Sequence, residues 1–159
     1  MPVRLTDGEI QALIAEPKPL PPRYRVRMQV RPKRGHKERE LNLTGVNGGK
    51  YRIILRQNSV NPLDFSVILA YLIPGTNQVF RLRRYNGKHE HSNVIEAQYF
   101  DDFHVHEATG RYQDLEKRED TFATPTDRFS DLNSAVACML ADCAFQLPEG
   151  EQAQLFEDA

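Results

Sequence analysis

The stretch FSVILAYLIP, residues 65–74, is the most apolar run in the chain and decides the predicted fold. A continuous apolar run of this length between polar loops is typical of a buried strand in the middle of a sheet. Its neighbours, KYRIILRQ at 50–57 and VFRLRRY at 79–85, also read as strands. Turn-forming residues precede the first neighbour (VNGG) and join the central run to the second (GTNQ). We therefore predict an antiparallel sheet built around residues 65–74.

Both ends of this sheet region carry a helix signal. In LTDGEI, Thr6 can cap a helix over residues 7–15, because Glu9 lies three residues later and can return the bond. After Ser130, apolar residues recur at i, i+3, i+4, i+7, i+8 and i+11, which predicts an amphipathic helix that is capped by Ser130 and ends before Pro148. The fold class is therefore α+β, a curved and mostly antiparallel sheet with an N-terminal and a C-terminal helix. We expect one domain over 1–148 and a flexible acidic tail over 149–159.

The N-terminal part of the chain is strongly basic. Residues 1–95 hold 17 Lys and Arg against 7 Asp and Glu, whereas residues 96–159 hold 4 against 15, although the net charge is only -1. The segment RYRVRMQVR alternates basic or polar with apolar residues, which predicts a strand with one basic face. Such a face could bind a phosphate backbone, so Arg23, Arg25 and Arg27 are candidate nucleic-acid ligands. The other interpretation is that the two halves neutralise each other within one fold.

Cysteine content and hydropathy favour a cytoplasmic protein. Cys138 and Cys143 lie five residues apart in the predicted helix and cannot bridge, which fits a reducing compartment. The N-terminus lacks a signal-peptide pattern, and no run approaches the roughly 18 apolar residues of a membrane span. We expect no membrane association.

Four of the five histidines form two His-x-His pairs, His89/His91 in RYNGKHEHSN and His104/His106 in FHVHEATGRY. Residues two apart in a strand share a face, so His104 and His106 should project together to the solvent side while Phe103 and Val105 enter the core. Asn-Gly at 86–87 is the strongest hairpin signal in the chain. That hairpin would place His89 opposite Arg84 and His91 opposite Leu82.

Three interpretations of this cluster stay open. In the first, a metal-independent ribonuclease uses one histidine as base and another as acid, Arg111 balances charge at phosphorus, and Tyr112 with Arg84 or Lys88 orients the phosphate. In the second, the four histidines bind zinc or another divalent metal in a hydrolase, with Glu96 or Asp102 as a further ligand. In the third, the histidines are structural. The first interpretation needs no cofactor.

The motifs RIILRQ, DFSVIL, RYNGKHEHSNVIE, FHVHEATGRYQ and TDRFSDLNSAV resemble a bacterial family of small proteins that share a domain of unknown function. The order Arg84-Tyr85-Asn86, then a histidine cluster and a second His-x-His pair, is similar to the TumE-like toxins of toxin-antitoxin modules. That resemblance implies a growth-inhibiting, RNA-directed protein that an antitoxin-like partner neutralises.

Residues and resemblance together predict a nucleic-acid-binding protein with the properties of a toxin-like ribonuclease. The leading alternative is a non-catalytic module that binds a nucleic acid, a nucleotide or a protein through its basic residues. In that case the histidines hold the fold together and do no chemistry.

Overall fold

The computed structural model describes residues 3–88, 91–115 and 118–148, except for the side chains of 91 and 92. His89 and the predicted tail at 149–159 lie outside the described residues. The main element is a seven-stranded sheet in the order β10-β9-β6-β5-β4-β3-β2, with every pairing antiparallel. Its strands are β2 (Arg31–Pro32), β3 (His36–Thr44), β4 (Lys50–Asn58), β5 (Phe65–Leu72), β6 (Val79–Asn86), β9 (His104–Glu107) and β10 (Ala123–Pro125).

The predicted central strand is confirmed as β5, which is the fourth of the seven strands. Phe65, Val67 and Leu69 alternate on the core face and are at most 2% exposed. The predicted strands on either side are confirmed as β4 and β6, which both pair with β5. This confirms an α+β fold with a mostly antiparallel sheet and a helix near each end of the chain.

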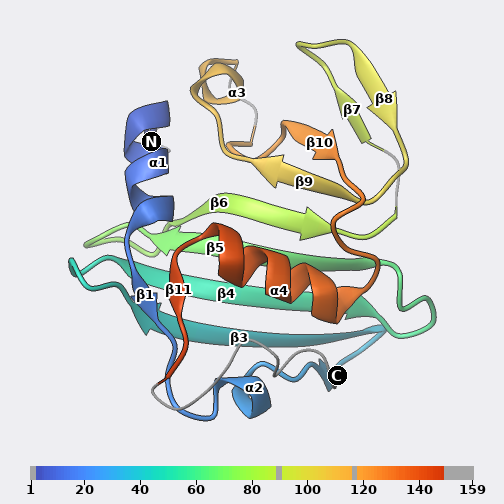
Figure 1. The fold of residues 1–159 in the computed structure, drawn as a ribbon. Coiled ribbons are helices and arrows are strands. Elements are labelled where there is room, and N and C mark those ends of the chain that lie inside the picture. Colours follow the sequence, from blue (N-terminus) through green and yellow to red (C-terminus); the bar gives the residue numbers. More distant parts are fainter. Residues whose placement is uncertain (1–2, 89–90, 116–117, 149–159) are drawn as a thin grey trace.

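The remaining elements surround the sheet. Helix α4 crosses one face of it, α1 stands beside one side, and α2 lies next to β3 at the lower edge in Figure 1. A separate hairpin, β7–β8, and α3 lie beyond β9 and β10. These elements are α1 (Asp7–Ala15), β1 (Lys18–Pro19), α2 (Tyr24–Arg27), β7 (His91–Asn93), β8 (Gln98–Phe100), α3 (Gly110–Asp114), α4 (Leu132–Asp142) and β11 (Phe145–Gln146).

The predicted helix boundaries at the N-terminus are confirmed. Thr6 accepts a hydrogen bond from the Glu9 amide, and the Glu9 side chain accepts one from the Thr6 amide, so the capping box is complete. At the other end, the cap of α4 is Asp131 rather than Ser130, because the Asp131 carboxylate accepts from the Ser134 amide at 2.8 Å. Cys138 and Cys143 are free thiols.

The predicted strand over residues 23–31 is wrong. The structure has the short helix α2 there, followed by an irregular segment and the two-residue strand β2. Tyr24 and Met28 lie four residues apart, as helical neighbours do, and both enter the core at 0% and 7% exposure. Val26 stays 46% exposed. Burial of one apolar pair at helical spacing prevails over the period-2 pattern that the same residues also satisfy.

The buried Lys18 connects the end of the first helix to the end of the last one. Lys18 is fully buried, and its ammonium nitrogen lies 2.8 Å from each of the carbonyl oxygens of Leu13, Ile14, Glu16 and Cys143, so its three N–H groups are shared among four acceptors. The carbonyls at the end of α1 and of α4 thereby share one donor group, next to the parallel pair β1–β11. Burial lowers the pKa of Lys18 to about 8.

Glu16 fixes the turn between β3 and β4. Its carboxylate accepts hydrogen bonds from the amides of Asn47 and Gly49 and from the Tyr51 hydroxyl. A Cβ at Gly45 or Gly49 would lie within 2.3 Å of a Glu16 atom, so only glycine fits these two positions. Burial raises the pKa of Glu16, but these hydrogen bonds together lower it by more than burial raises it. The net pKa therefore lies below the ordinary value.

Replacing Glu16 by Gln should destabilise the protein by about 1–3 kcal/mol at pH 7, the usual value of hydrogen bonds to a charged group. Because the folded-state pKa is lowered, the stabilisation by the carboxylate is complete above the unfolded-state pKa of about 4.3. It is lost as the pH falls through the folded-state value. Urea unfolding at pH 7 and pH 3.5 should therefore show a wild-type advantage that shrinks in acid. The exposed Glu40→Gln is the control, and an equal difference at both pH values would contradict the assignment.

Candidate functional site

His104 and His106 lie on one face of β9, as predicted, but that face is buried. Their side chains are 0% and 3% exposed, and their ring centroids are 4.9 Å apart. Strand β9 runs between β6 and β10, so His104 lies opposite Asn86 and His106 opposite Arg84. The Phe100 ring of hairpin β7–β8 packs edge-on against His104 at 5.4 Å. The prediction of solvent-facing imidazoles is wrong, because hairpin β7–β8 and the loop at Asp120 cover this part of the sheet.

Each of these imidazoles is anchored through Nδ1. In His104 this atom lies 2.7 Å from the carbonyl oxygen of Asp102, and in His106 it lies 2.8 Å from that of Asp120. A carbonyl oxygen only accepts, so Nδ1 carries the proton and donates in both rings. Nδ1 is therefore unavailable as a base at either position. Each bond also fixes the direction of the ring and attaches a loop to β9.

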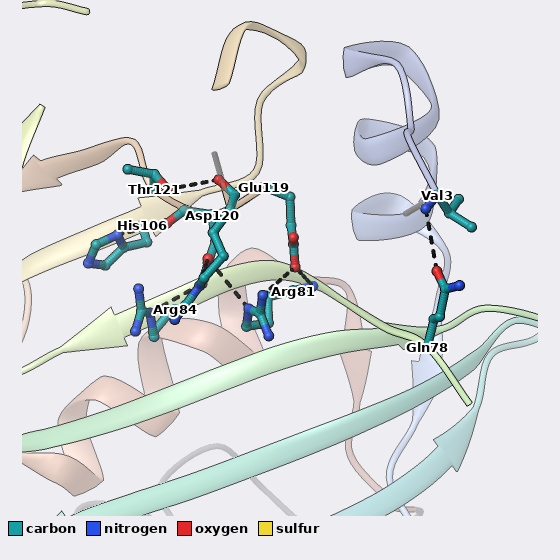
Figure 2. A network of polar contacts seen from close by, with 9 residues as sticks. Val3, Gln78, Arg81, Arg84, His106, Glu119, Asp120 and Thr121 are labelled. Atoms are coloured by element: carbon teal, nitrogen blue, oxygen red, sulfur yellow. Dashed lines mark hydrogen bonds and ion pairs between the residues drawn. The ribbon is translucent and has the colours of Figure 1, made fainter. Parts of the chain in front are cut away.

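The Asp120 carboxylate is the shared counter-ion of a group of arginines beside His106 (Figure 2). No sequence motif identified this residue as part of the site. The carboxylate is fully buried and lies 3.2 Å from Arg84 Nε and Arg118 Nε and 3.5 Å from Arg81 Nε. Arg81 also pairs with Glu119 at 3.0 Å. Burial lowers the pKa of Arg84, an effect that Asp120 partly offsets. Arg84, predicted to bind nucleic acid, is thus largely engaged within the fold.

Arg111 and Tyr112 are held by Glu96 rather than directed at the imidazoles. Arg111 Nη1 lies 2.7 Å from the Glu96 carboxylate, and its guanidinium stacks over Phe122 at 5.3 Å. The Tyr112 hydroxyl donates to Glu96 at 2.9 Å and accepts from the Ile95 amide. Burial and the bond to Glu96 raise the pKa of Tyr112. Glu96 therefore ties α3 to the turn of hairpin β7–β8.

The predicted hairpin at Asn86-Gly87 does not form. Strand β6 pairs with β9, and His91 instead begins β7, which pairs with β8. A Cβ on Gly87 would lie 1.8 Å from the Leu63 carbonyl oxygen, so glycine is needed for close approach and not for a tight turn. Whether His89 and His91 join His104 and His106 stays a prediction. Among the described residues, no group of three metal-ligating side chains occurs.

The predicted nucleic-acid ligands Arg23, Arg25 and Arg27 belong to a larger basic surface, which we define as residues 23–39. It comprises α2, β2 and the first part of β3, and holds eight Lys and Arg against one acid, Glu38. Glu38 is shared by Lys33 at 2.7 Å, His36 at 3.6 Å and Arg56 at 3.9 Å. Its pKa is lowered chiefly by the hydrogen bond from Lys33. Six cations of residues 23–39 form no salt bridge with a described residue, namely Arg23, Arg27, Arg31, Arg34, Lys37 and Arg39, and Arg23, Arg27, Arg31 and Arg34 are exposed.

A groove of about 780 Å³ opens beside this basic surface, between α2, β4 and the start of α4. Met28, Val30, Leu55 and Val136 contribute apolar side chains to its wall, and Arg25 also lines it. Lys88, the remaining predicted ligand, is exposed elsewhere and lies over the Phe103 ring at 5.9 Å.

Comparisons of the chain with protein-family models, with curated proteins and with solved structures give no match. The resemblance to the domain-of-unknown-function family and to the TumE-like toxins therefore stays a prediction. Among the described residues, no helix is long and apolar enough to cross a membrane.

Asp120→Asn should destabilise the protein by about 3–5 kcal/mol, because it removes a fully buried carboxylate and leaves the partly buried Arg84 beside two further guanidiniums without their common counter-ion. Chemical denaturation measures this loss. The control is Asp114→Asn, since Asp114 pairs with Arg4 at 3.4 Å on the surface and its side chain is 78% exposed. A loss of less than about 1 kcal/mol, the usual value of an exposed ion pair, would contradict the role given to Asp120.

Proposed function

We propose that this protein binds RNA or another nucleic acid through the basic surface of residues 23–39. The observation that carries the proposal is the excess of eight cations over one acid in that surface. Phosphate contacts supply most of the affinity in such complexes, and they require exposed Lys and Arg rather than a shaped active site. Antitoxin-like partners and RNA cleavage are not needed for this function.

The geometry of His104 and His106 supports a binding module over a ribonuclease. Metal-independent cleavage requires two groups that exchange protons with a 2′-hydroxyl and a leaving oxygen within hydrogen-bond reach. Both rings are at most 3% exposed, and each Nδ1 already donates to a backbone carbonyl. Arg111, assigned to the phosphorus charge, is instead paired with Glu96. These contacts favour the interpretation in which the histidines hold the sheet and its loops together.

The double variant Arg27→Gln/Arg34→Gln should weaken binding of a fluorescein-labelled 12-nucleotide RNA and lower its salt dependence. Each lost phosphate contact on a single strand reduces the slope of log K against log salt by about 0.7, so the slope should fall by about 1.4. Fluorescence anisotropy over a salt series measures both quantities. Arg4→Gln, an exposed cation on the other side of the molecule, is the matched control. Equal slopes for the wild type and the double variant would refute the proposal.

His106→Ala should leave RNA affinity unchanged while lowering stability by about 1–3 kcal/mol, because it leaves the Asp120 carbonyl without the imidazole donor. Anisotropy and urea unfolding of the same variant separate the two effects. The incubation of labelled RNA with wild type in chelator is the companion assay, and intact RNA is expected. Cleavage that persists in chelator and disappears in folded His106→Ala would support the ribonuclease instead.

A further inference from the structure

The groove beside the basic surface combines apolar side chains with polar ones and has one cation, Arg25, in its described lining. Its apolar wall comes from three elements that are remote in sequence, with Met28 after α2, Leu55 on β4 and Val136 on α4. Arg25 is the cation among its lining residues, and Arg23 and Arg27 lie on the same short helix, α2, or at its start. The acid at its edge, Asp131, is engaged as the cap of α4. A ligand that fits this groove therefore combines a bulky apolar group with negative charges.

The chain leaves the described structure close to this groove. Gln146 lies opposite Pro19 in the β1–β11 pair, and its carbonyl accepts from the Leu20 amide at 2.8 Å. Even if the four steps from Leu20 to Tyr24 were fully extended, at about 3.5 Å each, and the four helical steps to Met28 added about 1.5 Å each, Met28 would lie no more than about 20 Å from Leu20. The nine steps from Gln146 to Leu155 reach about 30 Å when extended. Residues beyond Pro148 can therefore enter the groove.

The segment that follows has the required chemistry. Residues 149–159 contain four acids, Glu149, Glu151, Glu157 and Asp158, and no cation. Their only bulky apolar side chains are the adjacent Leu155 and Phe156. Acids precede and follow this pair in the sequence. When the pair occupies the groove, their negative charges can face Arg25 and the basic surface. Burial of the two side chains supplies the driving force, and the charges supply the orientation.

We propose that residues 149–159 dock on their own chain, with Leu155 and Phe156 in the groove between α2, β4 and α4 and their acids against the basic surface. This docking proposal does not depend on the proposed function. One consequence rests on that function: the segment competes with RNA for the same cations and so regulates RNA binding.

Methionine methyl signals can test the docking in the full chain. The chain has three methionines, of which Met28 lines the groove and Met139 is fully buried in the core and is not among the groove's lining residues. In a methyl-labelled sample, Phe156→Leu removes the ring current of a docked phenyl group while it keeps an apolar side chain. The Met28 resonance should shift, and the Met139 resonance should not. Gln152→Ser/Gln154→Ser, in the same segment, is the matched control and should shift neither.

A Met28 signal that is identical in the wild type, Phe156→Leu and Leu155→Ser/Phe156→Ser would overturn the docking. A Met28 shift that depends on protein concentration would also overturn it, because a second copy would then occupy the groove. RNA anisotropy tests the consequence separately. Leu155→Ser/Phe156→Ser should tighten RNA binding by about tenfold, equivalent to the burial of about one apolar side chain. If Met28 shifts but RNA affinity does not change, the docking stands and the competition falls. If no variant binds RNA, the proposed function falls, and the Met28 shift still decides the docking.

Discussion

The hydrogen bonds of the buried Lys18 ammonium are the interaction on which the arrangement of the whole chain depends. The ammonium group donates hydrogen bonds to backbone carbonyls at the end of α1 and to the carbonyl of Cys143, which lies at the end of α4, 125 residues after Lys18. A buried cation is costly unless its donors all find acceptors, so this site is specific for one relative position of the two chain ends. Glu16, two residues earlier, extends the junction to the β3–β4 turn. This junction also decides where residues after Pro148 leave the fold.

A similar balance of charges decides the surroundings of the histidines. The Asp120 carboxylate pairs with three guanidiniums, and the backbone carbonyl of the same residue accepts a hydrogen bond from His106. Both groups belong to one loop, so the loop that buries the imidazole also supplies the counter-ion for Arg81 and Arg84. The consequence for function is that two residue types typical of catalysis, histidine and arginine, are used at this edge of the sheet for structure. Exposed cations in residues 23–39 then become the stronger functional feature.

Basic surface and groove form a combination that neither feature gives alone. Cations on an open surface attract any polyanion, whereas an apolar groove beside them selects ligands that carry an apolar group next to negative charge. RNA and the acidic C-terminal segment share the first property, and the pair Leu155–Phe156 gives the segment the second. Attachment to the same chain gives the segment a high effective concentration, which favours it further.

Local signals in the sequence were sufficient for the strands β4, β5 and β6 and for α1, because hydrophobic periodicity and capping act within a few residues. They were insufficient at residues 23–31, where alternation and helical spacing coincide and only burial of Tyr24 and Met28 chooses between them. The pairing of His104 with His106 followed from strand geometry alone, but their exposure did not. Burial of a strand face depends on which remote segment covers it, here Phe100 and the Asp120 loop, and no local pattern carries that information. The sequence by itself determined the three central strands of the sheet, β4, β5 and β6, and the excess of basic charge in residues 23–39. Only the tertiary structure decided which histidines and arginines are enclosed, because desolvation and ion pairing arise from contacts between segments far apart in the chain.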